Sequence, residues 1–269
     1  MSVSKVARIQ TIRERVSELE WQTRIDLAAA YRLTAIYGMT DLIYNHITAR
    51  IPGREDELLI NPYGYLYEEI TASSLVKIDI EGNILLQPDH GYGINPAGYV
   101  IHSAVHSARA DIGCVMHTHT RAGMAVSAMR CGLLPLTQTS MRFYERIGYH
   151  DFEGPALDLE ERARLVADLG AHDAIILRSH GLLVCGRTVA DTFNRMYFLE
   201  GACRLQVDAM ASGAELITPP TEVARLTARI MSPQGNPSSD KHRSDPMDGR
   251  LEWRALRRKL DRTDPSYAS

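Results

Sequence analysis

Several features that mark particular classes of protein are missing from the sequence. Its 269 residues include 30 Lys and Arg against 33 Asp and Glu, so the net charge of −3 gives no indication of nucleic-acid binding. No stretch approaches the roughly 18 to 20 consecutive apolar residues that a bilayer-spanning helix needs. The start of the chain lacks the apolar core of a signal peptide. We therefore expect a cytoplasmic protein that binds neither nucleic acid nor a membrane.

Cysteine and aromatic residues are also scarce. Aromatics make up 7% of the chain, and the four cysteines lie singly in apolar surroundings, with no C-x-x-C pair among them. Isolated thiols of this kind are typical of reduced, structural cysteines. By contrast, 45% of the residues are hydrophobic, which is ordinary for a globular protein and argues against disorder of the whole chain. A chain of this length can form one large α/β domain or two small ones.

Hydrophobic periodicity predicts a chain in which helices and strands alternate. Apolar residues recur at helical spacing in the segments 6–20, 21–37, 99–110, 122–129, 158–169 and 189–212. Strands are predicted over residues 45–51, 58–62, 75–80, 83–86, 112–118, 174–177 and 182–185. The dipeptide Glu81-Gly82 is expected to form a hairpin turn between two of these strands.

The composition changes after Met231. Residues 232–250 contain Pro, Gly, Asn, Ser and Asp with almost no apolar side chains, which is typical of a linker. A basic amphipathic helix is predicted at 251–260. We expect this helix to dock on its own fold or on a neighbouring subunit.

Ten histidines are distributed unevenly, and two of them carry the strongest indication of chemistry. His117 and His119 stand two residues apart at the end of the predicted strand 112–118. Side chains at positions i and i+2 of a strand point to the same face, so the two imidazoles are expected to lie side by side. Adjacent imidazoles are natural ligands of a divalent metal, and a pair of hydrogen-bonded structural histidines is the alternative.

His180 adds a third imidazole. It follows the apolar strand predicted at 174–177 and precedes Gly181, where the chain can turn tightly. The ends of strands are where α/β folds build their sites. Three histidines leave coordination positions open, which is typical of a catalytic rather than a structural metal. We therefore expect one divalent ion per subunit on His117, His119 and His180, with zinc as the expected metal and Fe(II) or manganese as alternatives.

The order and spacing of six motifs resemble the class II aldolase/adducin superfamily over residues 23–215. The motifs are Asn45–Arg50, Leu59–Gly64, Asn95–Gly98, His102–Ala104, Cys114–Thr120 and Ser179–Leu182. The resemblance implies one three-layer α/β/α domain around a mainly antiparallel central sheet, in a homo-oligomer that is usually a tetramer. Together with the composition, it divides the chain into a helical extension at 1–22, the main domain at 23–231, a linker at 232–250 and a C-terminal helix and tail at 251–269.

Departures from the family pattern bear on the substrate. Sugar-phosphate aldolases of the family carry an acid/base Glu after a Ser-Ser pair, whereas this chain has Gly98 after Pro96 and Ala97. A phosphate-binding Thr before a Gly is replaced by Tyr63 before Gly64. The resemblance is therefore to the adducin-like bacterial branch, which also has Gly at the Glu position. We expect a small, non-phosphorylated carbonyl compound or carboxylic acid as substrate, and aromatic ones would suit the more apolar pocket.

The resemblance also selects further residues for the site. The expected substrate-binding positions are Asn45, Tyr63, Gly64, Asn95, Pro96, Ala97 and Gly98. His102, one helical turn after Gly98, is a candidate for the proton transfer that the missing Glu would perform, with a packing role as the alternative. Tyr144 and Glu145 lie in a segment that approaches a neighbouring subunit's site in the family, and interface packing is the alternative for them.

Three functions are consistent with this pattern. The first is a metal-dependent lyase of the decarboxylase or aldolase type, with the metal as Lewis acid on a carbonyl or enolate oxygen. The second is a mononuclear non-haem Fe(II) oxygenase of the same fold, acting on an aromatic 2-oxo or hydroxy acid. The third is a non-catalytic interaction domain like that of adducin, against which the three histidines argue. Decarboxylation needs no base for a hydroxyl proton, so Gly98 favours it, and Gly98→Glu is the substitution expected to restore proton transfer.

Overall fold

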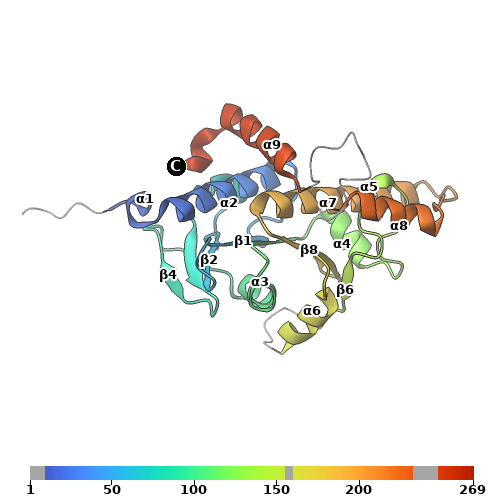
Figure 1. Cartoon of the computed structure of the whole chain (residues 1–269), viewed down its shortest axis with the longest axis horizontal. Coiled ribbons are helices and arrows are strands. Elements are labelled where there is room, and N and C mark those ends of the chain that lie inside the picture. The colour runs from blue at the N-terminus through green and yellow to red at the C-terminus, as the bar shows by residue number, and fades with distance from the viewer. Residues whose placement is uncertain (1–9, 155–159, 233–247) are drawn as a thin grey trace, which may run out of the picture.

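A computed structural model describes residues 10–154, 160–232 and 248–269. Its strands are β1 (His46–Arg50), β2 (Glu57–Ile60), β3 (Val76–Asp79), β4 (Ile84–Leu86), β5 (Cys114–Thr118), β6 (Gly148–His150), β7 (Ala174–Leu177) and β8 (Gly181–Gly186). Among the described residues they form a single sheet in the order β4-β3-β2-β1-β5-β8-β7-β6 (Figure 1). Neighbouring strands are antiparallel except for β6 and β7, which are parallel, so the predicted mainly antiparallel sheet is confirmed.

The register of the central strands brings distant histidines to one end of the sheet. His46 at the start of β1 lies opposite His117 near the end of β5. Across the next pair, His117 lies opposite Leu183 of β8, and Leu177 at the end of β7 lies opposite Gly181. The start of β1, the end of β5 and the β7–β8 turn therefore meet.

Helices cover both faces of the sheet, which gives the predicted three layers (Figure 1). They are α1 (Ile12–Arg15), α2 (Glu18–Ile36), α3 (Pro96–Ala108), α4 (Arg121–Ser127), α5 (Gln138–Met141), α6 (Glu161–Leu169), α7 (Val189–Ala211), α8 (Thr221–Ile230) and α9 (Arg250–Thr263), with 3-10 turns η1 (Tyr67–Glu69) and η3 (Pro265–Ala268). On one face, α2, α4, α7 and α9 share a core with Met116 of β5. On the other, α3 and α6 pack with its neighbour Val115, as the alternation of strand side chains requires.

The predicted division between helices at 6–20 and 21–37 is wrong. The structure has a short α1 and then a continuous α2 from Glu18, because the Ser17 hydroxyl accepts the backbone N–H of Glu20 and caps the helix there. The expected boundary between residues 22 and 23 therefore falls inside α2. Residues 1–9 lie outside the described part of the chain.

Three elements escaped the prediction from sequence: α5, β6 and α8. The first two have four and three residues, too few for a periodic pattern to be recognised. In α8 the sequence did contain a signal, since Val223, Leu226 and Ile230 recur at helical spacing. These three side chains are exposed, so α8 turns apolar residues to the surface of the chain.

The predicted C-terminal helix docks on this chain's own fold. Trp253 of α9 is buried against Phe193 of α7, with ring centroids 5.9 Å apart. The backbone N–H of Ala72 donates to the carbonyl of Tyr267 at 2.8 Å and ties the C-terminus to the main domain. Most of the predicted linker, residues 233–247, lies outside the described residues.

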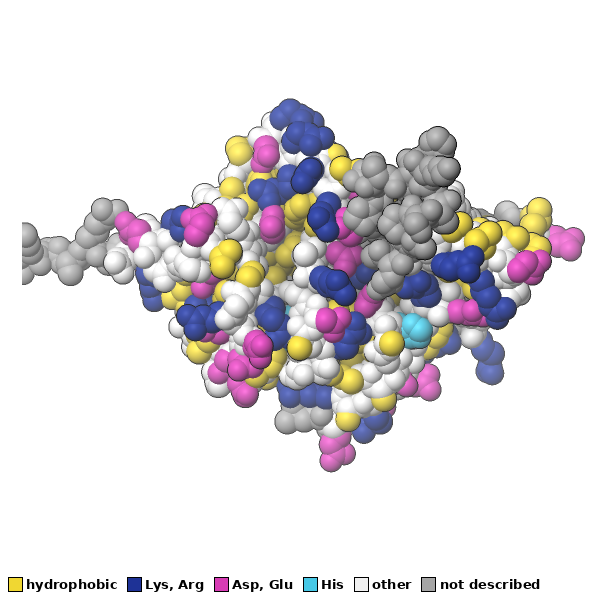
Figure 2. Space-filling model, viewed as in Figure 1, with side chains coloured by type: hydrophobic (Ala, Val, Ile, Leu, Met, Phe, Trp, Pro, Cys, Tyr) yellow, Lys and Arg dark blue, Asp and Glu magenta, His cyan; other side chains and the backbone are white. Residues whose placement is uncertain are grey.

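The surface carries charges of both signs. Figure 2 shows Lys and Arg side chains interspersed with Asp and Glu over the visible face. This distribution matches the nearly balanced charge of the sequence. Within the described ranges, every helix is too short or too polar to span a bilayer.

Candidate metal centre

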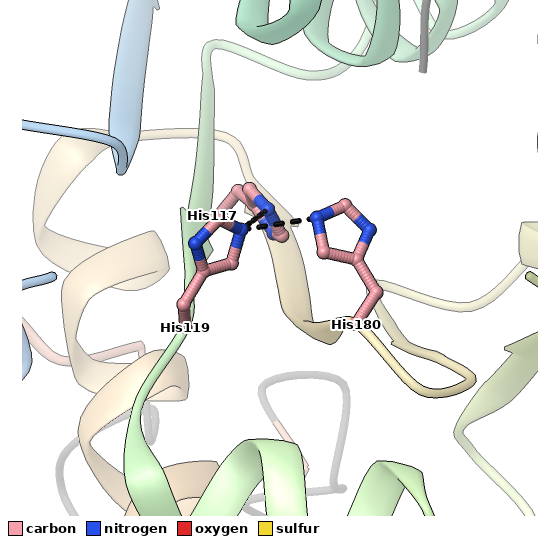
Figure 3. Close-up of side chains that lie close together, drawn as sticks. All are labelled: His117, His119 and His180. Carbon is pink, nitrogen blue, oxygen red and sulfur yellow. Dashed lines mark hydrogen bonds between the residues drawn. The ribbon is translucent and has the colours of Figure 1, made fainter. Parts of the chain in front are cut away.

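The three predicted histidines meet at the end of the central strands (Figure 3). His117 lies in β5, His119 follows just beyond the strand, and His180 lies in the turn between β7 and β8. The Nε2 atom of His119 is 2.8 Å from Nε2 of His117 and 3.0 Å from Nε2 of His180. Each imidazole therefore offers a ring nitrogen to the same small space.

The turn that carries His180 requires glycine at the next position. A Cβ on Gly181 would lie 2.4 Å from the carbonyl oxygen of Thr118, because β8 begins directly against the end of β5. Ser179 has a left-handed backbone with φ of 54°, and the backbone N–H of His180 donates to the carbonyl of Leu177 at 3.1 Å. This tight turn holds His180 beside His119.

Hydrogen bonds on the far side of two rings orient them. Nδ1 of His117 lies 2.9 Å from the carbonyl oxygen of Leu182, and Nδ1 of His119 lies 3.1 Å from Oδ2 of Asp41. A carbonyl oxygen only accepts, so Nδ1 of His117 carries the proton and its Nε2 keeps the lone pair. Oriented in this way, the Nε2 atoms of the two rings lie 2.8 Å apart. The donor set therefore fits a divalent metal.

Burial holds two of these rings in the neutral form that binds metal. Removal from water lowers the pKa of His117 well below its ordinary value of 6.5, and the neighbouring His180 and His119 lower it further. The pKa of His180 falls to about 4, mainly through burial and then through His119. Their lone pairs are therefore available at neutral pH.

Two residues of the loop between α2 and β1 hydrogen-bond to His119 and hold it in place. Asn45 accepts the backbone N–H of His119 through Oδ1 at 3.1 Å, and its amide donates to the carbonyl of Met39 at 3.1 Å. Asp41 in the same loop orients the His119 ring, and Leu42 beside it has a left-handed backbone with φ of 47°. Asn45, expected to bind substrate, is thus placed as an anchor for a histidine. No local pattern in the sequence points to Asp41, because it lies 78 residues from its partner along the chain.

We expect Asp41→Ala to weaken zinc binding by roughly 10- to 100-fold, because a metal-bound imidazole depends on the carboxylate behind it for orientation and basicity. A competitive titration against a chromophoric chelator measures this change. Asp41→Asn, whose amide oxygen can still accept a hydrogen bond from Nδ1–H, should lose less. The control Glu215→Ala removes an exposed carboxylate elsewhere. Equal zinc affinities in all four proteins would contradict the role given to Asp41.

His46 lies directly beside the trio. Its ring stacks on that of His117 with centroids 6.5 Å apart. Burial first, and then His119 and His180, lower the pKa of His46 to about 3, so the ring is neutral. A Cβ on Gly98 would lie 2.4–2.5 Å from three atoms of this ring. The expected effect of Gly98→Glu therefore needs correction, because that side chain cannot enter while His46 occupies the space.

His102 is buried and takes part in a polar cluster of α3 and β1. Its Nδ1 lies 2.8 Å from Oγ1 of Thr48, which is also 2.9 Å from Nε2 of His106. Burial lowers the pKa of His102 well below its ordinary value, and it lowers the pKa of His106 to about 3, with the charge of Arg50 as the second cause. The candidate proton donor of the sequence analysis is therefore a neutral, enclosed side chain.

The other expected substrate-binding residues lie around the start of α3 and the β2–η1 turn. Asn95 places Nδ2 3.5 Å from Nε2 of His46, and Pro96 begins α3 on the surface. The backbone N–H of Tyr63 donates to the carbonyl of Gly93 at 2.8 Å. Gly64 has φ of 122°, and a Cβ there would meet the ring of Tyr92 at 2.7 Å. The side chain of Ala97 lies outside the described part of the structure.

Tyr144 and Glu145 are not grouped with the trio in this chain. The Glu145 carboxylate forms a bidentate ion pair with Arg225 of α8, with oxygen–nitrogen distances of 2.6–3.0 Å. Tyr144 follows α5, and its backbone N–H donates to the carbonyl of Met141 at 3.2 Å. Any contribution of these two residues to a site would have to be made to a neighbouring subunit.

The buried histidine cluster predicts a loss of stability in acid. His106 has an ordinary pKa of 6.5 that falls to about 3 in the folded chain, so between these values the unfolded chain binds more protons. The stability contributed by the neutral ring is complete above pH 6.5 and is lost as the pH falls towards 3. We expect His106→Gln to flatten this dependence by up to about 1.4 kcal/mol per pH unit, measured by urea unfolding from pH 7 to 4. The control His172→Gln should keep the wild-type slope, and an unchanged slope in His106→Gln would contradict the prediction.

Fold and site together define a three-layer α/β protein with a histidine trio of metal-ligand type at the ends of its central strands. Residues 25–207, which contain all three histidines, match the family described as Class II Aldolase and Adducin N-terminal domain. The chain belongs to this family, and the resemblance drawn from its motifs is confirmed.

Relatives and solved structures support the same assignment. A provisionally named aldolase class 2 protein of Pseudomonas aeruginosa is 52% identical over 260 residues, 95% of each chain. Rat alpha-adducin is 41% identical over 246 residues, which are 88% of this chain but 33% of adducin. The crystal structure of an aldolase II superfamily protein from Pseudomonas syringae has a TM-score of 0.87 and 48% identity, covering 97% of this chain and 100% of that one. An L-fuculose 1-phosphate aldolase from Glaciozyma antarctica, at 24% identity, shares the fold with a TM-score of 0.79, covering 98% and 96%.

Proposed function

We propose that this protein is a metal-dependent lyase acting on a small, non-phosphorylated carbonyl compound or carboxylic acid, with decarboxylation as the favoured reaction. The observation that carries the proposal is the convergence of three imidazole nitrogens, with two of the rings oriented by hydrogen-bond acceptors behind them. Class II aldolases are typically metal-dependent lyases, which supports the same class of activity.

His117, His119 and His180 would hold one divalent ion, with zinc favoured over Fe(II) and manganese for three neutral nitrogen ligands. When bound, such an ion supplies Lewis-acid stabilisation of negative charge on a carbonyl or enolate oxygen. The chain's own residues prepare this site. The Leu182 carbonyl and the Asp41 carboxylate orient two of the ligand rings, and burial around His117 excludes water.

The residues around the trio support the choice of substrate. At the positions where sugar-phosphate aldolases of the family hold a phosphate, Pro96 supplies no hydroxyl and Tyr63 replaces the Thr by a bulky phenol, and Gly98 supplies no carboxylate. We assign six residues to the wall of the substrate pocket: Tyr63, Gly64, Asn95, Pro96, Ala97 and Gly98. Aromatic acids suit such a wall better than polar sugars do.

Proton transfer, where the reaction needs it, has three proposed sources. Tyr144 and Glu145 would act on the site of a neighbouring subunit, in a homo-oligomer for which we propose the tetramer. His102 would act within the chain, although its burial and its hydrogen bond to Thr48 favour a supporting role. Light-scattering mass measurement decides whether the protein is an oligomer at all.

Elemental analysis of the freshly purified protein and an oxygen electrode test the proposed function. About one zinc or manganese ion per chain, with decarboxylation or aldol cleavage of a panel of aromatic and aliphatic oxo and hydroxy acids and no oxygen uptake, supports it. Bound iron with oxygen consumption would replace the lyase by an Fe(II) oxygenase. A protein without metal and without affinity for one would instead favour an interaction domain, as the similarity to a third of alpha-adducin allows.

A further inference from the structure

His46 is a polar side chain beside the trio that is not one of the three ligands. It stands opposite His117 in the β1–β5 register, and the planes of the two rings are only 23° apart. The residue is 4% exposed, and its Nδ1 has no hydrogen-bond partner among the described residues. Buried polar atoms nearly always have a partner, so an orphaned nitrogen next to a candidate site points to a bound molecule.

The His46 imidazole occupies the position that a side chain at residue 98 would take. Position 98 lies in the first turn of α3, and a Cβ there would be 2.4 Å from Cδ2 and 2.5 Å from Cγ and Nε2 of His46. These distances are shorter than real Cβ contacts, so the helix can approach only because the residue has no side chain. The imidazole of His46 and a side chain at position 98 therefore exclude each other.

Hydrogen bonds hold the ring behind His46 in place. Nε2 of His106 lies 2.9 Å from Oγ1 of Thr48, which in turn lies 2.8 Å from Nδ1 of His102. Nε2 of His102 is also buried without a partner among the described residues, and the His102 ring lies edge-on to His46 at 5.9 Å.

We propose that His46 determines the specificity of the site by hydrogen-bonding a polar group of the molecule bound at the trio, with His102 as its positioning residue. The proposal rests on the proposed function, because it takes the bound molecule to sit on a metal held by the three histidines. Nε2 of His46 already lies 3.5 Å from the Asn95 amide, so Nδ1, unpartnered among the described residues, is the atom left for the bound molecule. As a donor or an acceptor, this nitrogen suits a carbonyl, a hydroxyl or one carboxylate oxygen. The neutral ring adds no positive charge for a phosphate dianion, in agreement with a non-phosphorylated ligand.

Cobalt-loaded protein and acetohydroxamate, a small chelator with one carbonyl and one hydroxyl oxygen, test the proposal. We expect His46→Leu to bind one cobalt ion per chain as the wild type does and to bind acetohydroxamate at least about tenfold more weakly, read from the visible cobalt spectrum. His46→Gln, which keeps a donor and an acceptor, should remain within about threefold of the wild type. The control His172→Leu should change neither quantity. Unchanged acetohydroxamate affinity in His46→Leu overturns the proposal, and so does loss of cobalt, which would make His46 part of the metal centre.

A second measurement tests the contact between His46 and Gly98 without any metal. Gly98→Ala should lower the apparent unfolding temperature of the wild type by about 5 °C or more, because the new methyl group meets the ring. In a His46→Gly background the same change should cost less than about 2 °C. Equal shifts in the two backgrounds overturn the placement of His46. If the wild type binds no cobalt, the proposed function fails. The comparison of Gly98→Ala in the two backgrounds still decides whether the imidazole of His46 packs against position 98.

Discussion

His117→Ala is expected to leave purified protein almost free of zinc, with affinity at least about 10³-fold below that of the wild type. Loss of a residue that merely supports a ligand costs 10- to 100-fold, and loss of one of three direct ligands costs more. The structure singles out His117 because its Nε2 faces Nε2 of His119, while its own Nδ1 is engaged by the Leu182 carbonyl. Elemental analysis and a chelator competition titration measure the effect.

The same substitution should leave the fold largely intact. Removal of the imidazole deprives the Leu182 carbonyl of its donor, which costs about 1–3 kcal/mol, well within the stability of a domain of this size. Far-UV circular dichroism and oligomer mass are therefore expected to match the wild type. His172→Ala is the matched control and should retain the metal. A zinc content near one ion per chain in His117→Ala would show that the trio is not the metal site.

Enzymatic activity should disappear together with the metal. Treatment of the wild type with a chelator ought to reproduce the behaviour of His117→Ala, and added zinc ought to rescue the treated wild type but not the variant. Turnover that persists in metal-free protein would mean that the site has been assigned wrongly, even if the trio binds zinc.

The part of the site that could be predicted from sequence is the part that local geometry dictates. His117 and His119 share a face of β5 because strand side chains alternate, and His180 was found because the strand before it is wholly apolar. Both signals need only a few neighbouring residues. The long helices and strands were predictable for the same reason, since each has a clear period, whereas the antiparallel sheet and its two helical layers were expected from the resemblance of the motifs to the family.

Asp41 and His46 could not be found in that way. Asp41 reaches His119 from a loop that is distant in sequence, and nothing around it resembles a ligand motif. His46 fits the alternation of an ordinary strand, and its importance appears only when the first turn of α3 packs over its ring at Gly98. Gly98 could be recognised in the sequence as the loss of the family's Glu carboxylate. The imidazole of His46, which occupies the space beside Gly98, comes from β1 and could not be connected with it from the sequence.

Arg24→Met is the substitution away from the trio for which we expect the largest loss of stability, about 3–5 kcal/mol. Arg24 is fully buried in α2, where it pairs with Glu20 at 2.9 Å. It also donates to the carbonyl oxygens of Ala72 at 3.2 Å and Leu75 at 2.8 Å. Its loss would take this donor from two buried carbonyls and, among the described residues, would leave Glu20 with only Lys77 at 3.0 Å. Urea unfolding at pH 7 measures the change.

Two further variants distinguish the destabilisation caused by removing one partner of the Arg24–Glu20 pair from the net contribution of the intact pair to stability. Arg13→Met removes an arginine whose partner Glu18 is exposed, and such a surface pair should contribute little to the free energy of unfolding. Arg24→Met combined with Glu20→Met removes both buried charges and should recover part of the loss, because an apolar replacement of a buried pair is often close to neutral. Zinc affinity should be unchanged in every folded variant, since Arg24 lies about 18 Å along α2 from the end that leads to Asp41. A double variant no more stable than Arg24→Met alone would mean that the orphaned carbonyls of Ala72 and Leu75, rather than the unpaired charge of Glu20, account for the loss.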